Sequence, residues 1–245
     1  MRSYAIGDIH GHLGLLTQAH TWIEADRART GDAEAPVIHL GDLADRGPDV
    51  RGVIDRLLTG QMTGKPWVVL RGNHDNMLAI FPDGGRDPGL REGLDYLHPK
   101  IGGVTSLESY GVDCSTKRNV TDIQADARRK IPAAHLEFLR DAPLYHLRGA
   151  VLFVHAGIRP GVPLAEQSDT DLMWIRQPFH DFHAPHPWLV VHGHTPVDTP
   201  MHYGNRVDID TGAAFGGPLT AVVIEGHDVF VLGPEGRSPL RPRTD

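Results

Sequence analysis

Residues 36–49 read Pro-Val-Ile-His-Leu-Gly-Asp-Leu-Ala-Asp-Arg-Gly-Pro-Asp, and their character changes midway. The apolar run at 37–40 is typical of a short buried strand. Gly41 then allows a sharp turn. Three charged side chains follow the turn: Asp42, Asp45 and Arg46. A carboxylate that directly follows a buried strand lies where open α/β sheets bind their ligands, so the stretch predicts a polar site at a strand end.

The composition is that of a globular chain with a sizeable core, since 40% of its 245 residues are apolar. The 24 Lys and Arg against 31 Asp and Glu give a formal charge of −7, which argues against charge-driven binding to nucleic acid. No apolar run reaches membrane-spanning length, and a strand begins near the first residue. We therefore expect no membrane partner, no signal peptide and a cytoplasmic location. The one cysteine, Cys114, excludes an internal disulfide.

The first part of the chain predicts a right-handed βαβαβ unit with parallel strands. Short apolar runs at 4–6, 36–40 and 66–70 each lead into a turn of glycine and polar residues. Between the runs, apolar residues recur at helical spacing, and Asp49 is placed to cap the second helix.

The remainder predicts a helical insertion and further strands. We expect the insertion at residues 76–139 to cover one side of the site, with short helices at 89–97, 103–110 and 133–139. Strands are expected at 144–147, 150–154 and 188–191. Later runs at 207–209, 219–224 and 229–232 favour antiparallel hairpins. A loose tail is expected from about residue 233, and because no linker interrupts the pattern, residues 1–245 are expected to form a single domain.

Five of the predicted strands lead, directly or through glycine, to side chains that can bind a metal. These side chains are Asp8, His10, Asp42, Asn73, His155 and His194. Because strand ends align at one edge of a sheet, we expect these side chains to meet in space. Carboxylate, imidazole and amide ligands without sulfur suit divalent ions such as Mn, Fe or Zn.

Such a site has the parts that phosphoester hydrolysis needs. The oxygens of Asp42 can bind one cation each. Two cations roughly 3.5–4 Å apart can hold a hydroxide between them for in-line attack on a phosphoryl group. Arg46 and Arg176 can bind the phosphate oxygens. His74, oriented by Asp45, is the candidate acid that protonates the leaving oxygen.

Five motifs occur in the order seen in one large enzyme family. They are Gly7-Asp-Ile-His-Gly11, Gly41-Asp-Leu-Ala-Asp-Arg-Gly47, Gly72-Asn-His-Asp75, His155-Ala-Gly157 and Gly193-His194. Together they resemble the signature of the PPP-type metallophosphoesterases, which include the serine/threonine protein phosphatases and their bacterial relatives. The match runs from residue 7 to about residue 213. The resemblance implies an α/β fold of the calcineurin-like type, a β-sandwich of mixed sheets flanked by helices.

The resemblance also implies a role for each site residue. The first metal would be bound by Asp8, His10 and Asp42. The second would be bound by Asp42, Asn73, His155 and His194. Arg46 and Arg176 would bind phosphate, and His74 with Asp45 would form the acid pair. The expected cofactor is a pair of divalent ions, manganese first, with iron or zinc as alternatives.

These expectations favour a phosphomonoesterase acting on Ser/Thr phosphoproteins or phosphopeptides. One alternative is a hydrolase of dinucleoside polyphosphates such as diadenosine tetraphosphate. The Asp45–Arg46 pair favours the phosphatase, because typical symmetrical dinucleotide hydrolases replace that aspartate. A second alternative is a catalytically silent metal-binding module. The loop with His180, His183 and His186 is expected to border the substrate groove, and the sequence fixes no oligomeric state.

Overall fold

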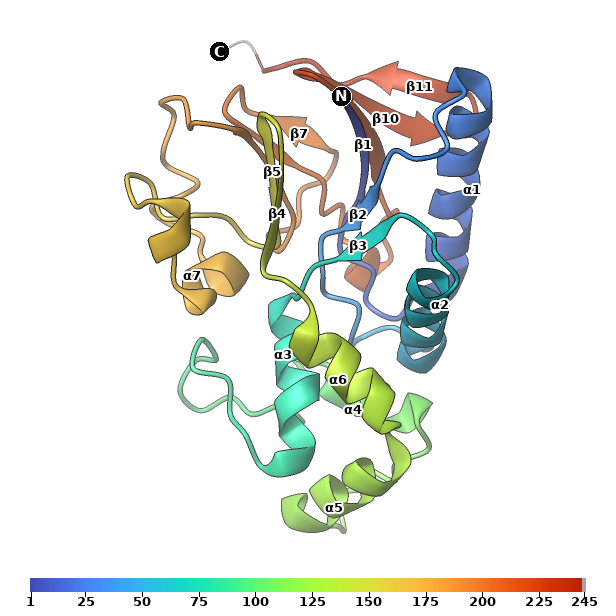
Figure 1. Cartoon of the computed structure of the whole chain (residues 1–245). Helices are drawn as coiled ribbons and strands as arrows, with labels where there is room; N and C mark the ends of the chain where they lie inside the picture. The colour runs from blue at the N-terminus through green and yellow to red at the C-terminus, as the bar shows by residue number, and fades with distance from the viewer. Residues whose placement is uncertain (244–245) are drawn as a thin grey trace.

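The computed structural model describes residues 1–243, in which two β-sheets face one another and helices cover their outer sides (Figure 1). The first sheet has the order β11-β10-β9-β1-β2-β3. Its strands are β1 (Arg2–Ile6), β2 (Val37–His39), β3 (Trp67–Val69), β9 (Ala221–Glu225), β10 (Asp228–Gly233) and β11 (Gly236–Pro239). The second sheet has the order β4-β5-β6-β8-β7. Its strands are β4 (Tyr145–Arg148), β5 (Val151–Val154), β6 (Leu189–His192), β7 (Met201–His202) and β8 (Arg206–Asp208).

Successive side chains of a strand point to opposite faces of the first sheet, so each face has an apolar core. In β1, Ala5 faces the second sheet and packs in one cluster with Phe153 and Val191. Its neighbours Tyr4 and Ile6 point the other way, into the cluster under the helices. Because side chains alternate between the faces of a strand, one short strand can serve two apolar layers. The fold is therefore the predicted β-sandwich of mixed sheets flanked by helices.

The helices divide between the outer faces and one end of the sandwich. The first sheet is covered by α1 (Leu13–Thr30) and α2 (Val50–Met62), and α7 (Asp169–Trp174) lies beside the second sheet (Figure 1). Four helices gather at one end: α3 (Asn73–Ile80), α4 (Gly103–Ser109), α5 (Val120–Lys130) and α6 (Ala133–Asp141). Short 3-10 turns occur at Phe81–Asp83, Leu164–Glu166 and Ala213–Phe215. No helix among residues 1–243 is both long and apolar enough to cross a membrane.

The predicted βαβαβ unit is confirmed. β1 pairs in parallel with β2, and β2 pairs in parallel with β3. The side chain of Asp49 caps α2 by accepting the Gly52 amide at 2.9 Å. The antiparallel hairpins predicted for the C-terminal part are only partly right: β9 and β10 pair antiparallel, and so do β7 and β8, but β8 also pairs in parallel with β6.

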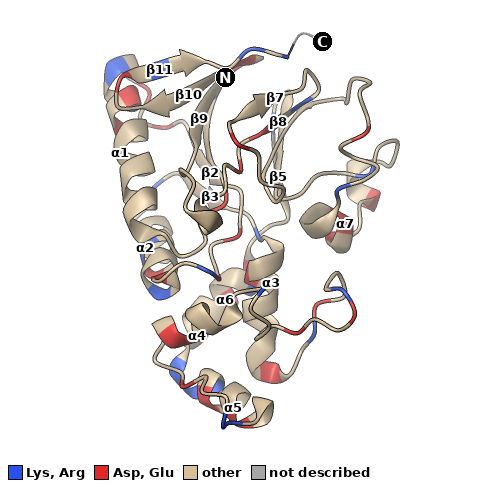
Figure 2. Cartoon of the chain, turned by 180° about the vertical axis from the view of Figure 1, so that it is seen from behind, with Lys and Arg blue, Asp and Glu red and all other residues tan. Residues whose placement is uncertain are grey.

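Two predictions in the insertion are wrong. Residues 89–97 form turns instead of a helix, since Gly93 takes a left-handed φ of 79° that ends any helical path. In contrast, no helix was predicted at α5, where five of the eleven residues are charged and the buried residues are Ile123, Asp126 and Ala127. That helix is stabilised by its ends: Asn119 caps the first turn, and basic residues fill the last. Figure 2 shows both charge signs along α5.

The loose tail expected from residue 233 is also wrong for the described part of it. Residues Gly236–Pro239 form β11, which pairs antiparallel with β10. The Arg237 guanidinium donates to both carboxylate oxygens of Asp26 on α1, at 2.7 Å each, and to Glu225 at 3.0 Å. This bidentate ion pair fixes the C-terminal strand to the first helix, so a segment rich in Pro and Arg is ordered here.

Candidate metal centre

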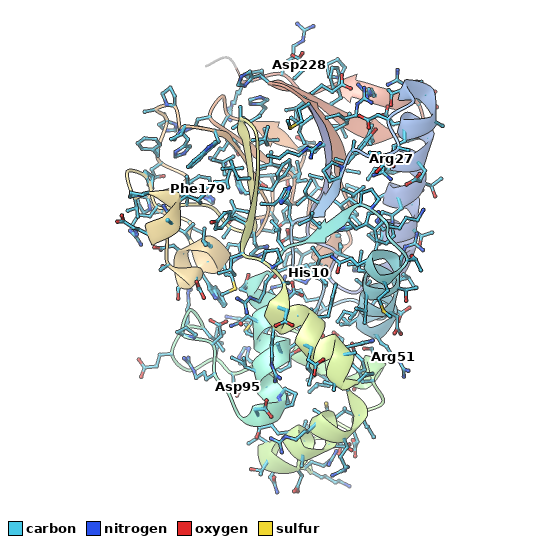
Figure 3. All side chains as sticks on the ribbon, in the orientation of Figure 1. His10, Arg27, Arg51, Asp95, Phe179 and Asp228 are labelled. Carbon is cyan, nitrogen blue, oxygen red and sulfur yellow. The ribbon has the colours of Figure 1, made fainter. Side chains whose placement is uncertain are left out.

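The candidate site lies where the carboxyl ends of strands from both sheets meet the insertion helices. Figure 3 labels His10 at this meeting point, in the middle of the molecule. Residues after β1, β2 and β3 come from one sheet, and residues after β5 and β6 come from the other. Eight of the ten predicted site residues line one cleft of about 150 Å³: Asp8, His10, Asp42, Arg46, Asn73, His74, Arg176 and His194. The other two, Asp45 and His155, are fully buried behind it.

Asp42 belongs to two groups of side chains that are close enough to share a cation. His10, Asp42 and His74 form one group, with ligand atoms within 4.8 Å of one another, and Asp42, His155 and His194 form the other. The two oxygens of Asp42 face different histidines: Oδ2 lies 3.5 Å from His10 Nε2, and Oδ1 lies 3.4 Å from His155 Nε2. This arrangement fits a carboxylate that bridges two metal ions.

Backbone carbonyls turn two histidines toward the cluster. His10 Nδ1 donates to the Ala44 carbonyl at 2.8 Å, and His155 Nδ1 donates to the Leu40 carbonyl at 2.9 Å. Burial lowers the pKa of both imidazoles, that of His10 to about 3, so both rings are neutral and each Nε2 carries a lone pair. Such carbonyl contacts are what fixes the tautomer of metal-ligating histidines.

The contacts of Asn73 test more strictly whether the second group could hold a metal ion. Its Oδ1 lies 2.9 Å from His155 Nε2 and 2.9 Å from His194 Nδ1. Since the proton of His155 is on Nδ1, its Nε2 lone pair faces an oxygen that is also an acceptor. Two buried acceptors at this distance repel unless a cation lies between them. The four predicted ligands of the second metal therefore fit an ion.

Asp8 lines the same cleft as His10 and Asp42. It belongs to neither three-residue group; instead its Oδ2 accepts the His194 amide at 3.0 Å. Its Oδ1 is buried without a hydrogen-bond partner in the described part of the chain, as is His194 Nε2. Burial and the charges of Asp210 and Asp42 raise the pKa of Asp8 well above its usual range. Crowded carboxylates with an unpaired oxygen are a second sign that the centre is built for cations.

The backbone is strained at this site. Among residues 1–243, the non-glycine residues with φ in the left-handed region are His10 (44°), Asp42 (48°), Asp45 (72°), Arg46 (68°) and His194 (69°). All five are predicted site residues. Left-handed φ is unfavourable for residues with a Cβ, so it persists only where surrounding contacts enforce it. Here the strain turns side chains from strand ends into one cleft.

The predicted acid pair is present. His74 Nδ1 donates to Asp45 Oδ2 at 2.7 Å, while Asp45 Oδ1 accepts the hydroxyls of Tyr96 and Ser106 at 2.6 Å each. Burial opposes the charged imidazolium, but the Asp42 charge and the Asp45 hydrogen bond outweigh it and raise the pKa of His74. His74 is thus held ready to carry a proton.

Two arginines supply positive charge to the cleft. Arg46 donates to His10 Nε2 and to His74 Nε2, at 3.1 Å each. Arg176 follows α7 and lines the same cleft. Burial and the charge of Arg91 lower the pKa of Arg176. Both guanidiniums can therefore reach a phosphate at the centre.

Several residues in and behind the cleft carry no predicted role. Asp210, Trp174 and Phe215 line it, and Tyr96 and Ser106 support Asp45 from the insertion. Of these five, Asp210 had a sequence signal: it begins Asp210-Thr-Gly-Ala213, the last stretch of the match to the PPP-type metallophosphoesterases that runs from residue 7 to about residue 213. The three histidines of the 177–187 loop belong to neither metal-capable group among residues 1–243. That this loop borders the substrate groove stays a prediction.

Relatives along most of the chain are named as tetraphosphatases, and a structural neighbour is named as a phosphatase. A protein from Anoxybacillus flavithermus named an asymmetrical bis(5'-nucleosyl)-tetraphosphatase is 29% identical over 238 residues, covering 89% of this chain and 88% of the relative. A protein of the same name from Halalkalibacterium halodurans is 28% identical over 240 residues, covering 89% and 87%. A cold-active protein-tyrosine phosphatase from a psychrophilic Shewanella species shares the fold, with a TM-score of 0.62, 16% identity and coverage of 98% of this chain and 80% of that one.

The sequence profile described as calcineurin-like phosphoesterase matches residues 1–230. That span contains all five motifs and every residue of the cleft. The chain therefore belongs to the calcineurin-like phosphoesterases, a family of metal-dependent phosphoester hydrolases to which the motifs had pointed.

Proposed function

We propose that this chain is a two-metal hydrolase of dinucleoside polyphosphates, with diadenosine tetraphosphate as the model substrate. The proposal of a two-metal hydrolase rests on the position of Asp42, whose two oxygens each face a different buried histidine. The substrate class is supported by relatives that match nearly the full chain and are named for tetraphosphate cleavage. This order of candidates reverses the preference for phosphoproteins that the sequence favoured.

The proposed ligands overlap the two groups around Asp42 but place Asp8 at the first ion, in the position that His74 has in the first group. His10 and Asp8, which has a buried unpartnered oxygen in the cleft, would hold the first ion with Asp42. Asn73, His155 and His194 would hold the second ion with Asp42. Bound divalent ions supply an activated water and polarise a phosphoryl oxygen. We propose manganese, because the oxygen and imidazole ligands are of intermediate hardness and no thiolate is among them.

The protein's own residues bind the phosphates and move the proton. Arg46 and Arg176 would bind phosphate oxygens from the rim of the cleft. When a phosphate draws Arg46 away from His74, the Nε2 atom becomes free to carry a proton. Asp45 holds that ring from the other side and favours its protonated form. His74 would then give the proton to the leaving phosphate oxygen, which stabilises the negative charge that develops there as the P–O bond breaks.

The test is a turnover comparison with Mn²⁺ on diadenosine tetraphosphate and on a phosphoserine peptide, with products separated by chromatography. We expect the dinucleotide to be cleaved at least tenfold faster in kcat/KM. An asymmetrical split would yield one product with a single phosphate and one with three. A phosphopeptide preference of tenfold or more would overturn the proposal and return the protein phosphatase to first place.

The protein phosphatase stays the second candidate because Asp45 is present and bonded to His74. A silent metal-binding module is the third, and absence of turnover on both substrates with metal bound would support it.

A further inference from the structure

Phe215 is an aromatic side chain left open at the rim of the metal-centre cleft. It lines the cleft, yet the residue is 69% exposed. Most phenylalanines bury their rings, since an exposed ring forfeits the free energy of removing apolar surface from water. A ring left exposed beside a polar centre is therefore typical of a site that a ligand covers.

The turn that carries Phe215 is fixed by hydrogen bonds. Phe215 lies at the end of the 3-10 turn Ala213–Phe215, where its amide donates to the Gly212 carbonyl at 2.8 Å. Gly217 also donates to that carbonyl at 2.9 Å. The Gly212 amide in turn donates to Asp210, inside the centre, at 3.0 Å. The ring is therefore presented by an ordered turn that is joined to the centre.

The neighbour of the ring is a phosphate-binding group. The guanidinium carbon of Arg46 lies 5.0 Å from the centroid of the Phe215 ring, within cation–π range. Because the ring remains mostly exposed, Arg46 covers only part of it. An arginine for the phosphate and an open aromatic face beside it together suit a nucleotide, whose base stacks on aromatic rings.

The other aromatic side chain of the cleft is already engaged. Trp174 donates from Nε1 to Asp87 at 2.9 Å, and its ring meets His194 edge-on at 5.9 Å. A Cβ on Gly89 would approach the Trp174 indole to 2.4 Å, so the ring is also packed against the insertion. Trp174 thus forms a wall, whereas Phe215 has a free face.

We propose that Phe215 is the platform on which the base of a bound nucleotide stacks while Arg46 holds the phosphate next to that nucleoside. The proposal rests on the proposed function and assigns it a subsite. Phe215 would set the preference for nucleotides over other phosphates and would take no part in proton transfer.

The experiment compares diadenosine tetraphosphate with inorganic tripolyphosphate, which has a phosphate chain and no base. We expect Phe215→Ala to lower the ratio of their kcat/KM values about tenfold, and Phe215→Trp to restore it, since stacking tolerates any aromatic ring. Met62→Ala is the control, because Met62 is 80% exposed at the far end of α2. An equal loss on both substrates would show that Phe215 only positions Arg46, and an unchanged ratio would show that it binds no base; either result overturns the proposal.

Failure of the proposed function is distinguishable. If the wild type cleaves no dinucleotide, AMP and ribose 5-phosphate are compared as inhibitors of aryl phosphate hydrolysis, with calorimetry as a second readout. A wild-type preference for AMP of about tenfold that Phe215→Ala removes supports the platform. Equal inhibition constants in the wild type overturn it.

Discussion

His74→Asn separates the two roles that His74 could have, and it is the most informative single change. His74 is the predicted acid, but it also lies within 4.8 Å of the ligand atoms of His10 and Asp42. If it is the acid, removing its imidazole removes proton transfer and leaves the metals in place. If it is a ligand, the first metal is lost.

The structure sets the size of the expected effect. General acid–base catalysis contributes about 10²–10⁴-fold, so kcat on phenyl phosphate should fall by that factor. Stability should fall by at most about 3 kcal/mol, the value of one hydrogen bond to a charged group. Asp45 keeps the Tyr96 and Ser106 hydroxyls, at 2.6 Å each, when it loses the imidazole. The variant therefore stays folded.

The assay has three readouts. Turnover is measured on phenyl phosphate and on p-nitrophenyl phosphate, whose less basic leaving group needs less protonation, so the variant should lose much less activity on it. Metal content is measured by elemental analysis and should stay at two ions per chain. His146→Asn on β4 is the matched control and should change none of these values. Loss of one ion, or equal losses on both substrates, would refute the acid role.

Three further predictions test the rest of the structure. Asp42→Asn should lower metal content from two ions to one or none and abolish turnover, and adding EDTA to the wild type should lower its Tm, because ions that bind only the folded state stabilise it; an unchanged Tm would contradict the metal centre. Arg237→Gln should lower the free energy of unfolding at pH 7 by about 2 kcal/mol. Burial by itself would raise the pKa of Asp26, but hydrogen bonds, that from Arg237 first among them, outweigh it and hold the pKa well below its usual range. The difference in unfolding free energy should therefore be present above the unfolded pKa of Asp26 and vanish as the pH falls through the folded one, as measured by urea unfolding at several pH values. Gly193→Ala should impair metal binding measured by calorimetry, because a Cβ there would lie 2.0 Å from Asp8 Oδ1, and wild-type affinity would refute the close approach.

The candidate ligands could be predicted from the sequence because each lies within four residues of a strand end. The turn after a strand keeps these residues near the edge of the sheet, so a short motif such as that around Asp42 indicates both a sheet position and a candidate ligand. The same logic found His155 and His194 although they belong to the second sheet. The expectation of convergence thus held across two sheets that face one another.

The supporting contacts could not be predicted, since they join residues far apart in the sequence. Ser106 meets Asp45 across 61 positions, and Tyr96 meets it across 51. Neither lies in a motif, and Tyr96 lies in a segment expected to be helical that forms turns. The C-terminal strand β11 is likewise held in place by the ion pair of Arg237 with Asp26, two residues that are 211 positions apart in the sequence. Short sequence patterns describe neighbouring residues and therefore do not predict such pairs.

The strain at the site links metal binding to folding. Each of the five left-handed non-glycine residues costs of order 1 kcal/mol or more, so together they oppose folding by roughly 5 kcal/mol. The net stability of a domain is only about 5–15 kcal/mol. The crowding of Asp8, Asp42 and Asp210 adds to this cost, as the raised pKa of Asp8 indicates. Cations at Asp42 would remove that repulsion, so the metals that the site needs for chemistry should also offset the strain that shapes it.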